Sequence, residues 1–226
     1  MDRRTFLART TGLASLAMPR WAREIVWAQA PVSADIILRG ATVYDGSGGS
    51  PFAAEVALQG DRIAAVGPGL TTTGAEVIDL QGLVLAPGFI DIHSHTDLVL
   101  LANPRAESKV RQGVTTEVVG QDGSSTGTWT DREFESTKDF YRSRYDVKID
   151  FRGLTGFFDR LSRTPGSVNL ASMIGAGSVR SLVVGDDNRG ATSEELKRMV
   201  SLIHEGLAAG ACGVSSGLEY VPGGFA

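Results

Sequence analysis

The chain has very little cysteine, since Cys212 is the single cysteine among its 226 residues. An internal disulfide requires two cysteines, so no disulfide framework within this chain is available to hold the fold together. With 42% hydrophobic and 21% charged residues, the composition is that of an ordinary globular protein that can bury a core. The fold must therefore be stabilised by packing.

Clustered positive charge and long apolar runs are also lacking. The formal net charge is -4, and the Lys and Arg residues are scattered along the sequence. A protein that binds nucleic acid or anionic lipid needs basic residues grouped on one face, so we expect no nucleic-acid partner. The longest apolar runs fall well short of the roughly 20 residues that span a bilayer, so we expect no stable membrane anchor.

The first thirty residues have the pattern of an export signal. Residues 3–7 (RRTFL) contain a twin-arginine pair, residues 12–18 are mildly apolar, and residues 28–30 (AQA) form a small-x-small cleavage site. This order predicts a twin-arginine signal peptide over residues 1–30, an export machinery as partner, and a periplasmic or secreted protein. The alternative is an ordinary basic N-terminus, which Arg20 and Arg23 behind the apolar run would suit.

Residues 31–88 have the pattern of a small β domain. Short runs in which apolar and polar residues alternate are separated by turn dipeptides such as Asp45-Gly46 and Gly60-Asp61. Such runs predict strands, and their close spacing predicts an antiparallel arrangement. The expected strands are residues 36–38, 41–44, 54–58, 62–66 and 76–79.

Residues 89–226 instead alternate apolar strands with helical periodicity, which is typical of βα units around a parallel sheet. Helices are predicted at 141–146, 157–163 and after Thr192, where Thr192 and Glu195 fit a capping box and Gly210 ends the apolar pattern. That pattern consists of Leu196, Met199, Val200, Ile203 and Leu207. The expected strands are residues 89–92, 115–119, 168–174 and 213–216.

The expected fold class is therefore α/β, with a small N-terminal β domain followed by the first half of a metal-dependent (β/α)8 barrel. A closed barrel of this kind takes about 250 residues, and four strands are half of its eight. Because half a barrel leaves an unpaired sheet edge, we expect residues 89–226 to be a truncated domain and the 226-residue chain to be inactive and poorly soluble alone.

The clearest chemical signal is the stretch from residue 86 to 97, APGFIDIHSHTD. Side chains alternate along a strand, so His93 and His95 point the same way and could bind one metal ion. In a parallel barrel this carboxyl end of the strand is where active sites lie. A lone His-x-His is more often a pair of solvated or capping histidines, but its position after an apolar strand favours a metal site.

This stretch resembles the first barrel strand of the amidohydrolase superfamily. The resemblance implies a metal ion, usually zinc, that polarises the scissile carbonyl and lowers the pKa of a water so that hydroxide attacks near neutral pH. It makes His93 and His95 metal ligands. Asp97 is a candidate for orienting one imidazole from behind, although a capping role in a loop or helix is an equal alternative.

A second segment, residues 111–125 (RQGVTTEVVGQDGSS), is similar to the second strand of the N-acyl-D-amino-acid deacylase (D-aminoacylase) group. Typical members of that group carry a metal-binding cysteine in the loop after this strand. Here the matching residue is Asp122, whose carboxylate can also ligate or bridge zinc. Asp122 is therefore a candidate ligand and catalytic residue, with a plain turn beside Gly123 as the alternative.

A third resemblance to the same group covers residues 187–192 (DNRGAT) and 207–223, where Gly213 to Tyr220 reads GVSSGLEY. The group's tyrosine lies at the substrate carboxylate, which makes Tyr220 a substrate-binding candidate; a packed loop aromatic is the alternative. Ser215 superficially resembles a nucleophile-elbow serine, but no histidine is paired with it. Ala176 stands where typical members have a histidine, and His204 is expected to be solvated.

The resemblance implies a zinc-dependent deacylase that hydrolyses the amide bond of N-acyl-D-amino acids, with a small N-acyl amino acid as substrate. One alternative is a hydrolase of cyclic amides, related to dihydroorotases or hydantoinases; those usually carry a bridging carboxylated lysine, and no lysine here is predicted at a strand end. The other alternative is a noncatalytic metal-binding remnant.

Overall fold

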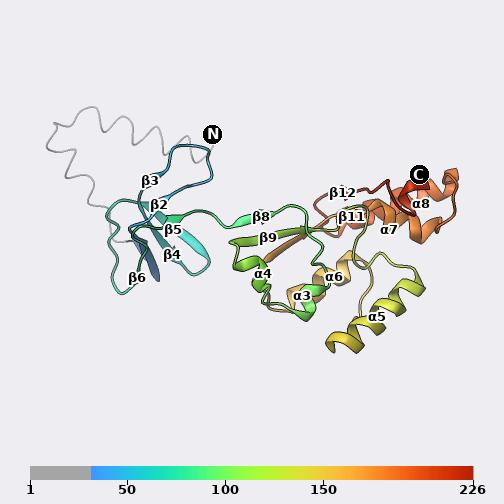
Figure 1. The fold of residues 1–226 in the computed structure, drawn as a ribbon, viewed down its shortest axis with the longest axis horizontal. Helices are drawn as coiled ribbons and strands as arrows, with labels where there is room; N and C mark the ends of the chain where they lie inside the picture. Colours follow the sequence, from blue (N-terminus) through green and yellow to red (C-terminus); the bar gives the residue numbers. More distant parts are fainter. Residues whose placement is uncertain (1–31, 226) are drawn as a thin grey trace. The chain divides into compact units, whose positions relative to one another are not determined.

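The computed structural model describes residues 32–225 (Figure 1). The predicted export signal, residues 1–30, lies outside the described residues. The chain divides into two compact units between Pro87 and Gly88, and each unit is described by itself below. No helix in the described part is long and apolar enough to cross a membrane.

The first unit contains two small sheets. Strands pair in the order β5-β4-β1-β6 in one sheet and β3-β2-β7 in the other. Two small apolar clusters form the core of this unit: one includes Ile37 and Ala57 of the first sheet, and the other combines Val56 of the first sheet with Val43 of the second. The strands are β1 (Ile36–Arg39), β2 (Thr42–Val43), β3 (Phe52–Ala53), β4 (Glu55–Gln59), β5 (Arg62–Gly67), β6 (Glu76–Asp79) and β7 (Val84–Leu85).

The expectation of a wholly antiparallel domain was wrong. The pairs β1·β4, β4·β5 and β2·β3 are antiparallel, but β1·β6 and β2·β7 are parallel. Residues 68–75 carry the chain from β5 to the far side of β1, and Leu70 in this connection is buried against Ile37 and Ala57. Alternation of apolar and polar residues determines which face of a strand is buried, but not the direction of its partner.

The second unit is built on parallel strands, as predicted. A three-stranded sheet has the order β10-β9-β8, and β11 pairs with β12. The expected strand at 168–174 is divided at Met173. The strands are β8 (Phe89–Asp91), β9 (Val114–Val119), β10 (Asn169–Ser172), β11 (Ile174–Gly175) and β12 (Val214–Ser215).

Helices connect these strands and pack against them. The main core contains Val119 from β9, Phe157 from α6 and Val179 from α7, all fully buried. Phe157 stacks on Phe151, with 5.9 Å between the ring centroids. The helices are α3 (Val99–Ala102), α4 (Glu107–Val110), α5 (Asp131–Tyr145), α6 (Gly153–Ser162), α7 (Ala176–Val183), α8 (Ser193–Ala208) and the short 3-10 helix η1 (Gly223–Phe225).

The capping box predicted for α8 is confirmed. The Thr192 hydroxyl accepts a hydrogen bond from the Glu195 amide at 3.3 Å, and the Glu195 carboxylate accepts from the Thr192 amide at 2.8 Å. The Arg189 guanidinium donates two hydrogen bonds to the same carboxylate, one from each terminal nitrogen. Together with the Thr192 bonds, they lower the pKa of Glu195 to about 2. Arg189 is exposed and Glu195 is partly exposed, so this contact orders the helix start and adds little stability.

Helix α8 buries fewer of its periodically spaced apolar side chains than the sequence suggested. Met199 and Ile203 pack on the core, whereas Leu196 and Val200 remain exposed. His204 is exposed on the same helix, and Cys212 is exposed just beyond it.

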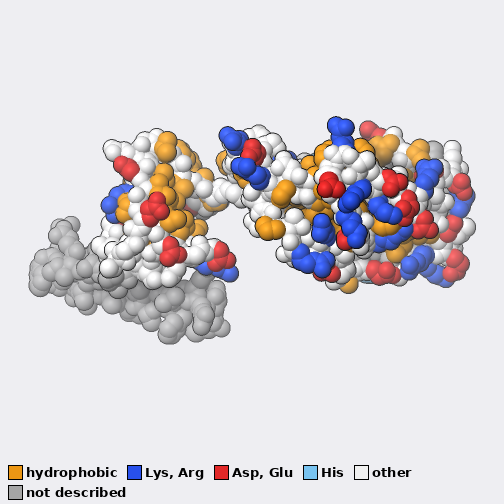
Figure 2. Space-filling view, turned by 90° about the horizontal axis from the view of Figure 1, so that it is seen from below, with side chains coloured by type: hydrophobic (Ala, Val, Ile, Leu, Met, Phe, Trp, Pro, Cys, Tyr) orange, Lys and Arg blue, Asp and Glu red, His pale blue; other side chains and the backbone are white. Residues whose placement is uncertain are grey.

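Basic and acidic side chains are interspersed over the displayed face of the second unit (Figure 2), as the scattered Lys and Arg residues of the sequence led us to expect.

Candidate metal centre

The two histidines of the APGFIDIHSHTD stretch follow directly after β8. Beyond the end of that strand the chain stays aligned with β9, because the Ser94 amide donates to the Val118 carbonyl at 3.0 Å. The Gln121 side chain donates to the Ile92 carbonyl at 2.8 Å. The segment that carries His93 and His95 is thus tied to the carboxyl end of the neighbouring strand.

The structure brings His93, His95 and Asp122 together. Asp122 follows β9, and its Oδ2 lies 3.3 Å from His93 Nε2 and 3.2 Å from His95 Nε2. The three candidate ligand atoms all lie within 4.8 Å of one another. The imidazole centroids are 5.4 Å apart, so both rings face the same carboxylate.

This donor set fits a zinc-like divalent ion. Bond lengths of about 2.0–2.2 Å in a tetrahedral site place neighbouring ligand atoms roughly 3.3–3.5 Å apart, close to the separations between Asp122 and the two imidazoles. Two imidazoles and one carboxylate are also a ligand set that catalytic zinc takes, with further positions left for water or substrate. The three side chains are between 47% and 58% exposed, so such an ion would be accessible from solvent.

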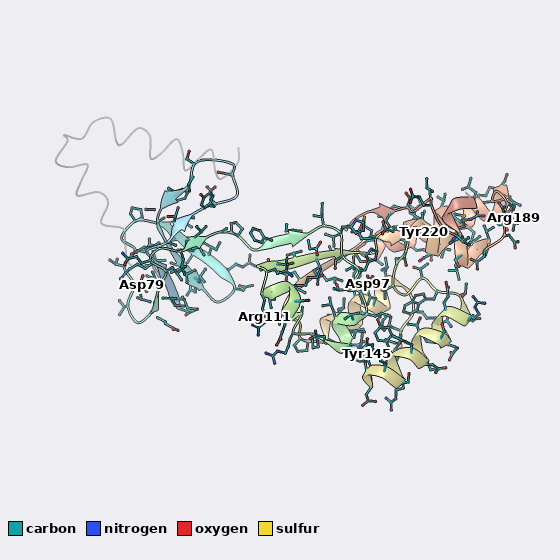
Figure 3. All side chains as sticks on the ribbon, viewed as in Figure 1. Asp79, Asp97, Arg111, Tyr145, Arg189 and Tyr220 are labelled. Carbon is teal, nitrogen blue, oxygen red and sulfur yellow. The ribbon has the colours of Figure 1, made fainter. Side chains whose placement is uncertain are left out.

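Asp97, the candidate for orienting an imidazole, makes a different contact. Its Oδ1 accepts a hydrogen bond from the Thr126 hydroxyl at 3.1 Å, and in the described part of the chain it has no hydrogen bond to either imidazole. Burial raises the pKa of Asp97, and the Thr126 bond partly opposes that rise. Asp97 and Tyr220 are labelled in Figure 3. That Asp97 orients an imidazole therefore stays a prediction.

Tyr220 reaches the loop that carries Asp122. Its hydroxyl donates a hydrogen bond to the Asp122 carbonyl, while half of the residue is exposed. Ala176, where typical deacylases have a histidine, begins α7 close by, since the Ser178 amide of that helix donates to the Gly123 carbonyl at 2.8 Å. His204 is not a member of the candidate metal-binding cluster.

Residues 76–150 match the model of an amidohydrolase family. The chain is also 40% identical, over 85% of its length, to an N-acyl-D-aspartate deacylase of Alcaligenes xylosoxydans xylosoxydans. The chain is related to the amidohydrolases of the D-aminoacylase group. The resemblance seen in the sequence is therefore confirmed.

Solved structures of the D-aminoacylase group share this fold. An N-acyl-D-glutamate deacylase from Bordetella bronchiseptica, in complex with zinc and a phosphonate that mimics the tetrahedral intermediate, superposes with a TM-score of 0.74 at 30% identity. It matches 87% of this chain and 40% of its own. A D-aminoacylase described as having a binuclear metal centre gives 0.75 at 36% identity, over 85% and 40% of the two chains.

The chain spans about two-fifths of the length of these relatives, with 38% of the N-acyl-D-aspartate deacylase covered. What it shares with the D-aminoacylase group is thus a mixed α/β fold with small β sheets, like the N-terminal part of those structures. The activity of the whole protein is a matter for proposal.

A network of charged side chains next to the segment that carries the two histidines was not predicted from the sequence. Asp91, the last residue of β8, accepts a hydrogen bond from the His93 amide at 3.2 Å through Oδ1. Its Oδ2 accepts from Lys109 Nζ of α4 at 2.6 Å. This bond is the main cause that lowers the pKa of Asp91 and raises the pKa of Lys109.

Lys109 also lies 3.0 Å from Oε1 of Glu117, a fully buried residue of β9. The same oxygen accepts hydrogen bonds from the hydroxyls of Ser94 at 2.6 Å and Thr96 at 3.1 Å. Ser94 and Thr96 alternate with the two histidines, so the network holds the segment that carries these candidate ligands. An acidic residue on β9, a strand that otherwise carries only valine and threonine, was the signal that could have revealed it.

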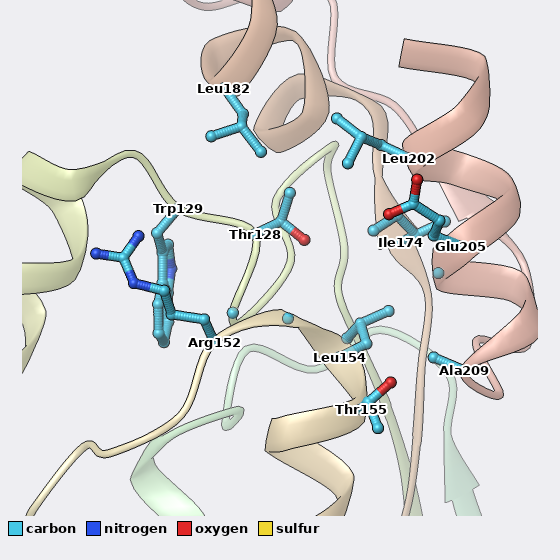
Figure 4. Close-up of a pocket in the computed structure, with 13 residues that line it drawn as sticks. Thr128, Trp129, Arg152, Leu154, Thr155, Ile174, Leu182, Leu202, Glu205 and Ala209 are labelled. Carbon is cyan, nitrogen blue, oxygen red and sulfur yellow. The ribbon is translucent and has the colours of Figure 1, made fainter. Parts of the chain in front are cut away.

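A separate cavity of about 340 Å³ lies among α6, α7, α8 and the loop before α5 (Figure 4). Leu154, Leu182 and Leu202 line it together with Trp129 and Arg152. His93, His95 and Asp122 are not among its lining residues. The cavity therefore does not belong to the candidate metal centre.

Proposed function

We propose that the protein containing these residues is a metal-dependent deacylase that hydrolyses the amide bond of N-acyl-D-amino acids. The observation that carries this proposal is the convergence of His93, His95 and Asp122 at the carboxyl ends of two adjacent parallel strands. The names of the related deacylases support the substrate class. A bound metal would supply Lewis-acid polarisation of the amide carbonyl and activation of the attacking water.

Zinc is the metal we propose, because imidazole nitrogen and carboxylate oxygen suit it and a related deacylase structure contains it. His93 and His95 would hold the ion, and Asp122 would complete or bridge the site. We also propose that Asp97 helps to orient an imidazole of this site. The Tyr220 hydroxyl already donates to the Asp122 carbonyl, so in this arrangement its proton is not available to a substrate carboxylate.

We propose further that β8 to β12 form part of a (β/α)8 barrel. The parallel pairings of these strands and the helices between them support this architecture. In such barrels the catalytic groups lie at the carboxyl ends of the strands, which is where both histidines and Asp122 follow their strands.

The expected result for the full-length gene product, loaded with zinc, is hydrolysis of N-acyl-D-amino acids well above the rate for their L enantiomers. Paired D and L substrates, followed by release of the free amine, give the measurement. Dihydroorotate and a hydantoin serve as controls for the cyclic-amide alternative. Preference for the L series would remove the deacylase assignment, and preference for a cyclic amide would favour the alternative; no hydrolysis of any of them would support the remnant.

We propose that residues 1–30 direct export through the twin-arginine route, so that the mature protein acts in the periplasm or outside the cell. The twin-arginine pair Arg3 and Arg4 and the AQA sequence at 28–30 support this. N-terminal sequencing of periplasmic protein is expected to begin at or near Pro31. Recovery of the protein with Met1 intact, in the cytosol alone, would contradict it.

A further inference from the structure

The loop that presents Asp122 has an unusual backbone. Gly120, Asp122 and Gly123 all have positive φ, at 75°, 54° and 78°. Glycine adopts such angles freely, and Asp tolerates the left-handed region better than most residues do. The loop also lies beyond the end of β9, at Val119, so ladder hydrogen bonds do not hold it. Other contacts must fix where the Asp122 carboxylate points.

The Ser215 hydroxyl forms hydrogen bonds to the backbone of this loop on both sides of Asp122. The Ser215 Oγ of β12 accepts a hydrogen bond from the Gly123 amide at 3.0 Å and donates one to the Gly120 carbonyl at 2.6 Å. Ser215 is only 8% exposed, so water does not compete strongly for either bond. Its proton is donated to a backbone carbonyl and not to a histidine or another base, so the described residues provide no group that would activate it as a nucleophile.

A second contact comes from the same segment of the chain. The Tyr220 hydroxyl donates to the carbonyl of Asp122 itself. Ser215 is held in turn by the parallel pairing of β12 with β11, in which it lies opposite Gly175. Residues 215–220 therefore touch the loop at the carbonyls of Gly120 and Asp122 and at the amide of Gly123, while the Asp122 carboxylate remains directed at His93 and His95.

We propose that Ser215 and Tyr220 are positioning residues that fix the Asp122 loop and thereby set how tightly a metal is held. This inference rests on the proposed metal centre. Neither side chain is itself among the candidate ligands. Their effect on the metal passes through the backbone on either side of Asp122, as hydrogen-bonded partners of metal ligands commonly act in proteins.

Zinc affinity, measured by competition with a chromogenic chelator, tests the proposal on the full-length protein. Ser215→Ala is expected to weaken zinc binding by about 10–100-fold, the usual effect of losing such a partner. Ser215→Thr keeps the hydroxyl and is expected to retain most of the affinity. Ser216→Ala is the matched control, because Ser216 is the adjacent exposed serine, and its affinity should stay within about twofold of the parent because no such partner is lost.

Tyr220→Phe provides a second variant in case Ser215→Ala does not fold, since Tyr220 is half-exposed and its ring is retained. It too is expected to weaken zinc binding. The visible absorption spectrum of the cobalt(II) protein adds a readout of ligand geometry, and it should change in both variants but not in Ser216→Ala. Parent-like affinity and spectra in Ser215→Ala, or in Tyr220→Phe where Ser215→Ala does not fold, would overturn the proposal.

Asp122→Ala separates this outcome from a failure of the proposed function. If Asp122→Ala weakens zinc binding while Ser215→Ala and Tyr220→Phe do not, the metal centre stands and the positioning role is wrong. If Asp122→Ala binds zinc as the parent does, Asp122 is not a ligand and both the complete centre and the inference built on it fall.

Discussion

Replacing His93 and His95 together by alanine is expected to remove tight zinc binding from the protein. The two Nε2 atoms are the nitrogen donors of the cluster, and Asp122 alone would then remain. Loss of a hydrogen-bonded partner of a ligand costs about 10–100-fold in affinity, so loss of two ligands should weaken binding by at least about 1,000-fold. Activity should be lost with the metal.

Metal content after dialysis, measured by elemental analysis on folded protein, checks this result. His204→Ala is the matched control, because His204 is the third histidine of the chain and is exposed on α8, outside the cluster. The control should retain the metal content of the parent. A double alanine variant that still holds one equivalent of zinc would show that the metal lies elsewhere.

Lys109→Met is expected to destabilise the protein by about 2–3 kcal/mol, because it leaves the buried Glu117 carboxylate without its cation. Glu117 is fully buried, and its second oxygen, Oε2, has no hydrogen-bond partner within the described residues. The loss should fall below that of a wholly buried pair because the Lys109 side chain is still 21% exposed. The His93 amide would keep Asp91 as acceptor, but Asp91 would lose Lys109.

Urea unfolding followed by circular dichroism measures this change. Lys138→Met is the control: Lys138 pairs with Glu135 at 2.7 Å on exposed α5, so its loss should cost about 0.5 kcal/mol or less. Adding Glu117→Gln to Lys109→Met should recover part of the stability, because the neutral amide can still accept from Ser94 and Thr96. Equal stability of Lys109→Met and the parent would contradict a stabilising role for the network.

The sequence predicted the parts of the site that depend on local pattern. An apolar run followed by His-x-His was enough to place His93 and His95 together after β8, because side-chain alternation is a property of any strand. The capping box at Thr192 was predicted for a similar reason. The same T-x-x-E signal at Thr130 and Glu133 was overlooked, so α5 was expected only from residue 141, although it begins at Asp131.

Features that depend on contacts between distant residues were not predicted. Lys109 and Glu117 belong to a helix and a strand whose packing no local pattern specifies, and the parallel pairing of β6 with β1 depends on a connection that carries no periodic signal. Ser215 was considered only as a nucleophile. Its partners, Gly120 and Gly123, lie more than 90 residues earlier in the chain.

The exposed thiol of Cys212 has a practical consequence. It is the only cysteine in the sequence and lies three residues before Ser215, and its own amide is fixed to the Ser172 carbonyl at 2.9 Å. Within these 226 residues, a fluorophore or spin label can therefore be attached at one defined place. Such a label would sit on the segment that contacts the Asp122 loop and could report, in real time, how that segment responds when metal is added or withdrawn.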